Sequence, residues 1–253
     1  MSDRSIRSTL VDVYTMLRHP EAIGLRRRGV RYDHYRELNQ RWLTDFGIRT
    51  ILDVGANVGQ FARLARAVFP DATIYSFEPL PECFDKLREA LPGDNSFFPI
   101  RAGVGSKPGE LKFYRSFHSP SSSFLQMEDL HKEAFPYTIE GQESQPLTVD
   151  VVTLDHALAD KQIETPLLVK IDVQGYELEA IAGAQQTLAM ASVVVLEMSF
   201  GKLYAGQPLF HDVYEKMHSM GYVFRGSLAQ MSHPQTGAVV QMDAIFVNED
   251  RDR

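Results

Sequence analysis

"ILDVGANVGQF", residues 51–61, joins an apolar run to a stretch with helical periodicity through a turn that contains Gly55 and Gly59. In an open α/β sheet, the first strand-to-helix turn lies where the strand order reverses, and cofactors bind there at the carboxyl ends of the strands. Glycines allow the backbone to approach a ligand closely, and a helix that begins at Gln60 directs its first amide groups to the same place. The stretch therefore predicts a cofactor-binding turn in an α/β fold.

The rest of the chain alternates between β-branched or aromatic runs and amphipathic runs. Strands are expected at 50–54, 73–77, 96–104, 166–172, 192–198, 222–227 and 244–248, and helices at 59–69, 81–91, 175–190 and 208–221. Apolar runs separated by helices are typical of a parallel sheet that is covered on both faces. The pattern predicts a mostly parallel, seven-stranded sheet with helices on both sides.

Two regions lie outside this alternation. Residues 1–46 are expected to form a helical N-terminal appendage, and residues 47–253 the main domain. Within that domain, about 107–153 is an insertion before the fourth core strand, with an added pair of strands at "ELKFYRS" and "QPLTVDVVTL". Long insertions of this kind usually shape a binding site.

The composition narrows the classes of partner and compartment. A net charge of −7 among 253 residues offers little attraction for nucleic acid, so no nucleic-acid partner is expected. No run approaches the roughly 20 apolar residues of a membrane-spanning helix. The single cysteine, Cys83, and the absence of a signal-peptide pattern favour a cytoplasmic location. A homo-oligomer is compatible with the sequence.

Two acidic residues near the glycine turn indicate which cofactor it holds. The spacing departs from G-x-G-x-x-G because Asn57 occupies the second glycine position. Asp53, two residues before the first glycine, would repel a pyrophosphate but suits the cationic amino-acid end of S-adenosylmethionine. Glu78, in "SFEP" at the end of the next strand, is placed to accept hydrogen bonds from ribose hydroxyls. The alternative interpretation is that both acids only cap helices.

Several motifs together resemble those of the FkbM family of S-adenosylmethionine-dependent methyltransferases. They are "DVGANVGQF", "FEP", "VTLD" and above all "VKIDVQGYELEAIAGA" followed by "VVVLEMSF", and the resemblance covers residues 50–200. It implies a Rossmann-like class I methyltransferase fold with S-adenosylmethionine as cofactor. It also implies O-methylation of a hydroxyl on a sugar, polysaccharide or glycosylated natural product, so the partner would be a small-molecule or glycan acceptor.

Other functions stay open at this point. They are N- or carboxyl-methyl transfer, a nicotinamide-dependent oxidoreductase, against which Asp53 and Asn57 argue, and a Rossmann-like binding protein without turnover. The predicted cofactor-binding residues are Asp53, Gly55, Asn57, Gly59, Gln60, Phe61, Glu78, Pro79, Gly103 and Asp172.

The fourth core strand supplies the leading catalytic candidate. Asp172 ends this strand beside the cofactor turn, where a carboxylate can take a proton from an acceptor hydroxyl or position it. Alternatively, Asp172 caps the following helix or binds the cofactor amine. Lys170 lies on the same face of the strand and is expected to form an ion pair with Asp172. Glu197, at the end of the fifth strand, is an alternative base.

The insertion offers a further group of polar residues in "SFHSPSSSFLQ". His118 is another candidate base, since its ordinary pKa lies near physiological pH. Ser121, Ser122 and Ser123 are candidates for substrate binding, although serine-rich loops are more often simply solvated. No metal site is predicted, because the histidines lack the spacing and third ligand of a zinc site.

Overall fold

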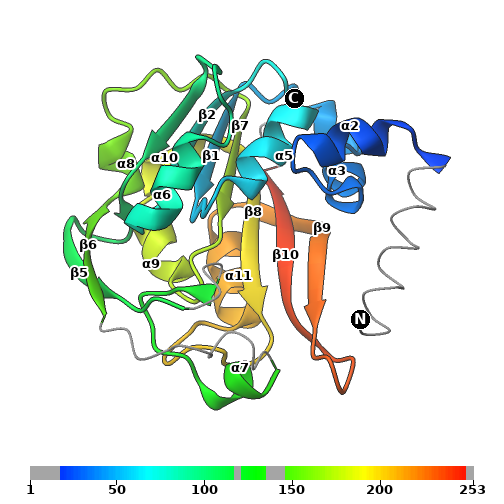
Figure 1. Cartoon of the computed structure of the whole chain (residues 1–253). Helices are drawn as coiled ribbons and strands as arrows, with labels where there is room; N and C mark the ends of the chain where they lie inside the picture. Colours follow the sequence, from blue (N-terminus) through cyan, green and yellow to red (C-terminus); the bar gives the residue numbers. More distant parts are fainter. Residues whose placement is uncertain (1–17, 117–120, 135–145, 249–253) are drawn as a thin grey trace.

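A seven-stranded sheet runs through the middle of the molecule in the computed structural model, which describes residues 18–116, 121–134 and 146–248 (Figure 1). The strand order is β3-β2-β1-β7-β8-β10-β9. The strands are β1 Thr50–Val54, β2 Thr73–Phe77, β3 Phe97–Ile100, β7 Leu167–Ile171, β8 Ala191–Ser199, β9 Tyr222–Ser232 and β10 Val239–Asn248. All neighbours are parallel except β10, which is antiparallel to both β8 and β9. The predicted Rossmann-like sheet is confirmed, and its order reverses between β1 and β7.

Helices cover both faces of this sheet. The helices are α2 Glu21–Arg27, α3 Tyr32–Leu38, α4 Arg41–Thr44, α5 Gln60–Val68, α6 Pro81–Arg88, α7 Asp129–Ala134, α8 Leu154–Ala157, α9 Glu177–Ala182, α10 Gln185–Met190 and α11 Phe210–Ser219. The single helix expected over 175–190 is divided in two by Gly183. A Cβ at Gly183 would lie 2.0 Å from the carbonyl oxygen of Gly105, so this position allows two backbone segments to touch. None of the helices in the described part of the chain is long and apolar enough to cross a membrane.

Alternate residues of the central strands enter two separate cores. Leu52 and Val169 pack with α9, α10 and α11 on one face, whereas Ile51 and Leu168 pack with α5 on the other. The second core also contains Leu25, Val30, Leu38 and Leu43 from the N-terminal segment. The N-terminal helices therefore help to cover the sheet.

The insertion and the preceding strand β4 form a second, three-stranded sheet at the edge of the molecule. Its order is β4-β6-β5, with β4 at Gly103–Val104, β5 at Gly109–Phe113 and β6 at Leu147–Val152. The antiparallel pair β5–β6 confirms the two added strands. The single strand expected at 96–104 is instead shared between the sheets, since β3 pairs with β2 and β4 pairs with β6.

Candidate active site

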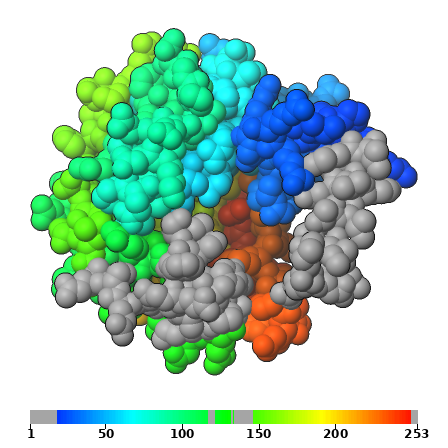
Figure 2. Space-filling model, viewed as in Figure 1, coloured from blue at the N-terminus to red at the C-terminus, as the bar shows by residue number. Residues whose placement is uncertain are grey.

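A cavity of about 410 Å³ opens at the carboxyl ends of β1, β2, β7 and β8. Residues of α3, β9, β10 and the insertion complete its wall. Figure 2 shows red atoms of β10 deep in a hollow beside the blue N-terminal helices. A cavity of this size at a switch point of the sheet is the usual place for a small-molecule site in such folds.

The turn after β1 forms one wall of the cavity, and its first glycine packs against the residue that follows β7. Gly55 has a φ of +80°, and a Cβ there would lie 1.8 Å from the carbonyl oxygen of Asp172. Asn57 also has a positive φ, of +48°, which asparagine tolerates better than most residues. Gly59 does not line the cavity. A Cβ at this position would lie 2.5 Å from the Cβ of Ala90, which follows the C-terminus of α6. The first glycine thus joins the turn to β7, and the second allows α5 to pack near α6.

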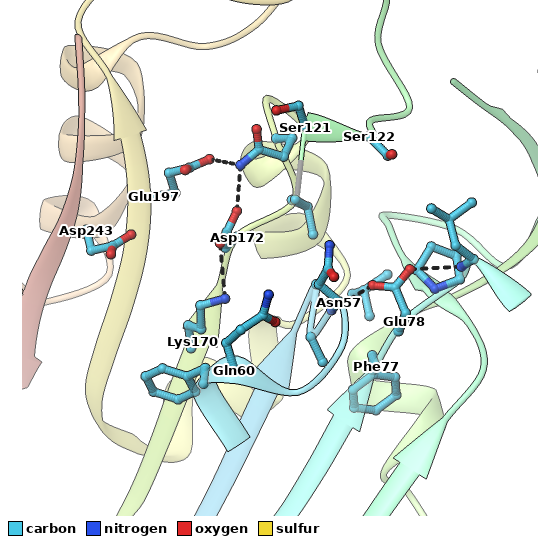
Figure 3. Close-up of a pocket in the computed structure, with 18 of the residues that line it drawn as sticks. Asn57, Gln60, Phe77, Glu78, Ser121, Ser122, Lys170, Asp172, Glu197 and Asp243 are labelled. Carbon is cyan, nitrogen blue, oxygen red and sulfur yellow. Dashed lines mark hydrogen bonds and ion pairs between the residues drawn. The ribbon is translucent and has the colours of Figure 1, made fainter. Parts of the chain in front are cut away.

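Glu78 lies at one end of the cavity, as Figure 3 shows. It is only 5% exposed, and its two carboxylate oxygens accept hydrogen bonds from the backbone N–H groups of Asn57, at 2.8 Å, and Leu80, at 2.9 Å. Burial raises the pKa of Glu78 to about 7, although the two amides oppose this. An ionised carboxylate has about four acceptor positions, so Glu78 can still accept bonds from ligand hydroxyls.

Lys170 lies between two aspartates in the middle of the site. Its Nζ is 3.1 Å from Oδ2 of Asp172, which confirms the expected ion pair, and 3.7 Å from Oδ1 of Asp53. Burial alone would lower the pKa of Lys170, but the carboxylates of Asp172 and Asp53 outweigh it and raise the pKa. Asp53 is fully buried, and burial raises its pKa against the opposing effect of Lys170.

A single amide connects the acids at the ends of β7 and β8. Gln174 donates from Nε2 to Oδ1 of Asp172, at 2.8 Å, and to Oε2 of Glu197, at 2.5 Å. The hydroxyl of Tyr204 lies 2.7 Å from Oε1 of Gln174 and donates to it, which defines the orientation of the amide. Gln174 has a φ of +52°, an uncommon conformation for this residue type. Burial, followed by the charge of Asp172, raises the pKa of Glu197 well above its ordinary range.

The structure brings most of the predicted site residues to the cavity wall. Those that line it are Gly55, Asn57, Gln60, Phe61, Glu78, Pro79, Gly103, Ser121, Ser122, Asp172 and Glu197. Asp53 and Ser123 do not line the cavity. Asp53 is buried next to Lys170, and the hydroxyl of Ser123 donates to the backbone oxygen of Gln174 at 2.6 Å. His118 lies outside the described residues. The roles of all these residues stay predictions.

Several wall residues were not predicted from the sequence. They are Gln174, His131, Gln241 and Asp243, together with His34 on the N-terminal segment. His131 is 3% exposed, and its ring centre lies 5.1 Å from that of Tyr204. In "QMDA", residues 241–244, polar and apolar residues alternate, which is the pattern of a strand with one face toward a polar cavity. No group of three or more His, Cys, Asp or Glu side chains in the described residues is arranged to hold a metal ion.

Comparison with known proteins identifies relatives over a large part of this chain. The hexuronic acid methyltransferase AglP of Haloferax volcanii is 30% identical over 152 residues, which are 59% of this chain and 55% of that protein. The 2-O-methyltransferase NoeI of Sinorhizobium fredii is 27% identical over 160 residues, 62% of this chain and 66% of that protein. The matches thus span between half and two thirds of the length of these curated relatives.

A solved structure and a family model agree with the fold. The crystal structure of Methyltransferase FkbM from Methylobacillus flagellatus KT matches with a TM-score of 0.51 and 13% identity, covering 83% of this chain and 47% of that one. Residues 53–224 match the model of the Methyltransferase FkbM domain. The chain therefore belongs to the FkbM methyltransferase family, as the motifs of the glycine turn and of β7 predict.

Proposed function

We propose that this member of the FkbM methyltransferase family is an S-adenosylmethionine-dependent O-methyltransferase that acts on a hydroxyl of a sugar, polysaccharide or glycosylated metabolite. One observation carries the proposal: Asp172 lies between the Glu78 end of the cavity and the end formed by Glu197 and Asp243 (Figure 3). One end suits a nucleoside, and the other suits a hydroxylated acceptor. The names of two relatives, a hexuronic acid methyltransferase and a 2-O-methyltransferase, support a sugar hydroxyl.

The residues at the first end fit S-adenosylmethionine. Glu78 is buried at the cavity wall with acceptor capacity left for ribose hydroxyls, and Gly55 removes the side chain that would separate the turn from β7. Asn57, Phe77 and Pro79 surround the same end. The bound cofactor would supply an activated methyl group on a sulfonium, and these residues would hold its nucleoside part.

The residues at the centre fit the handling of the acceptor's proton. Methyl transfer to oxygen requires that the hydroxyl lose its proton and be held in line with the bond that breaks. Asp172 is held from one side by the ammonium of Lys170 and from the other by the amide of Gln174. These contacts leave Asp172 oriented toward the cavity as the acceptor of that proton. Raised above its ordinary range, the pKa of Glu197 suits it better to hold a proton than to remove one.

Calorimetry and a methyl-transfer assay test the proposal. We expect S-adenosylhomocysteine, but not NAD, to bind, and Glu78→Ala to weaken that binding by about 1 to 3 kcal/mol, because a buried hydrogen-bonding partner is lost. Asp172→Asn keeps the shape and should lower turnover by roughly 10²- to 10⁴-fold with cofactor affinity nearly intact.

Asp71→Asn, in an exposed loop before β2, is a matched control that should change neither quantity. Binding of NAD with no response to S-adenosylhomocysteine would refute the assignment. A joint loss of turnover and cofactor affinity in Asp172→Asn would instead show that Asp172 holds the cofactor.

A further inference from the structure

Two polar side chains of β10 line the cavity with polar atoms that make no hydrogen bond within the described residues. Gln241 is 2% exposed and lines the cavity, and its Nε2 has no hydrogen-bond partner among the described residues. Asp243 lies two residues along the same strand, and therefore on the same face, and also lines the cavity. Within the part of the chain that the structure describes, its carboxylate makes no hydrogen bond or salt bridge, although the charges of Lys170 and Asp172 act on it. Buried polar atoms are nearly always paired, so the unpaired amide of Gln241, beside the partly exposed carboxylate of Asp243, indicates a ligand that supplies the missing bonds.

The register of the sheet places these groups beside the catalytic candidates. Asp243 is directly opposite Glu197 in the antiparallel pair β10–β8, and Figure 3 shows both at the same end of the site. One oxygen of Glu197 accepts from Gln174, which leaves the other available. The wall next to β10 is apolar, because Leu228, Ala229 and Met231 of β9 line it. Carboxylates and an amide beside an apolar surface match the hydroxyls and the C–H face of a sugar ring.

The charges at this end of the cavity distinguish between classes of sugar. The carboxylates of Asp172 and Asp243 line it, whereas the lysine beside them is already paired with Asp172, at 3.1 Å, and Asp53, at 3.7 Å. Arg31, farther along the wall, donates to both oxygens of its neighbour Asp33. A sugar carboxylate placed near Asp243 would therefore meet like charge in a poorly solvated site.

We propose that Gln241 and Asp243 form an acceptor subsite that binds a vicinal diol of a sugar ring without an acidic group and rejects uronic acids. The inference rests on the proposed function, since it assigns a role to the acceptor half of the same cavity. Asp243 accepts hydrogen bonds from two neighbouring hydroxyls, and the amide of Gln241 donates to a hydroxyl or ring oxygen.

Matched sugars test this selectivity without knowledge of the natural acceptor. The probes are methyl glycosides of glucose, galactose and mannose, each compared with the methyl glycoside of its own uronic acid, so that members of a pair differ only at one carbon. Binding to the protein saturated with S-adenosylhomocysteine is measured by saturation-transfer NMR titration. The measurement is made at about pH 8, above the pKa of about 6 to which burial raises Asp243.

We expect at least one neutral glycoside to bind and its uronic acid to bind at least about tenfold more weakly. Asp243→Asn keeps the size of the side chain and should reduce this difference to less than about threefold, because the repulsive charge is gone. Gln241→Ala should weaken the neutral glycoside and leave S-adenosylhomocysteine affinity unchanged. Asp71→Asn serves as the control and should preserve the discrimination.

Uronic acids that bind as well as their neutral partners would overturn the subsite, as would discrimination that Asp243→Asn leaves intact. Binding of S-adenosylhomocysteine with no glycoside bound would also overturn it while leaving the cofactor assignment standing. Failure of S-adenosylhomocysteine itself to bind would refute the proposed function and the inference with it.

Discussion

Replacement of Lys170 by methionine should destabilise the protein strongly, because it leaves a buried aspartate without its cation. Asp53 is fully buried and lies 3.7 Å from the ammonium, and its other described polar contact is the hydroxyl of Ser76 at 3.3 Å. At that separation and an effective dielectric constant of about 20, the attraction is about 4 kcal/mol. Loss of one partner of a buried pair costs about 3 to 5 kcal/mol. We therefore expect Lys170→Met to lower the free energy of unfolding by that amount.

Urea denaturation of four variants separates this effect from simple loss of packing. Asp53→Asn combined with Lys170→Met removes both charges and should restore most of the lost stability, whereas Asp53→Asn alone leaves Lys170 paired with Asp172 only. Lys161→Met is the control: its pair with Asp160 is exposed, so the change should stay below about 1 kcal/mol. The deficit of Lys170→Met should shrink toward acid pH, where Asp53 can take up a proton more easily.

Two results would contradict this reasoning. A loss below about 1 kcal/mol in Lys170→Met would show that the pair contributes little. A double variant no more stable than Lys170→Met would show that packing, not charge, is responsible. The double variant also tests the prediction that Asp53 contacts the cofactor. If Asp53 only balances the charge of Lys170, the stable double variant should still bind S-adenosylhomocysteine. If Asp53 contacts the cofactor directly, the double variant should lose that binding.

Three further predictions concern the turn after β1, the first residue of α9 and the insertion. Gly55→Ala should destabilise the fold by about 2 to 4 kcal/mol in thermal or urea unfolding, because its Cβ would lie 1.8 Å from the Asp172 carbonyl oxygen; an unchanged midpoint would refute that close contact. Burial raises the pKa of Glu177 from about 4.5 to about 7, so between these values the unfolded chain releases a proton that the folded chain retains, and stability falls as the pH rises. Glu177→Gln should remove about 3 kcal/mol of that fall, and parallel pH curves would count against it. Ser121→Ala combined with Ser122→Ala should lower turnover and spare cofactor affinity, since both residues line the cavity near the insertion; normal turnover on the true acceptor would exclude a substrate role.

The sheet could be predicted because its central strands β1, β7 and β8 are buried on both faces and read as apolar runs. Where the prediction failed, a contact distant in sequence decided the outcome. The helix expected over 175–190 ends before Gly183 because that residue touches the backbone of Gly105. The sequence predicts a last strand that begins only at Ala244, whereas β10 begins at Val239. Its first half carries polar residues that face a cavity, and these interrupt the apolar run.

The site shows a similar division between local and distant information. Glu78 and Asp172 were identified because strand ends at a known edge of an α/β sheet are local features of the sequence. Gln241 and Asp243 could not be, since their place beside Glu197 depends on the antiparallel register of β10 with β8. The role of Gln174 depends on Tyr204, thirty residues later, which orients its amide.

The two strand-end acids, equivalent candidates in the sequence, become unequal in the structure. Both accept from the same amide of Gln174, so that contact does not distinguish them. The ammonium of Lys170 lies 3.1 Å from Asp172, whereas no described cation forms an ion pair with Glu197, and burial raises the pKa of Glu197 well above its ordinary range. Two carboxylates this close repel each other when both are charged, and this repulsion adds to the effect of burial on the pKa of Glu197. We therefore expect Asp172, held by the ammonium of Lys170, to accept the proton of the acceptor hydroxyl, with Glu197 protonated beside it as a hydrogen-bond donor to the same substrate.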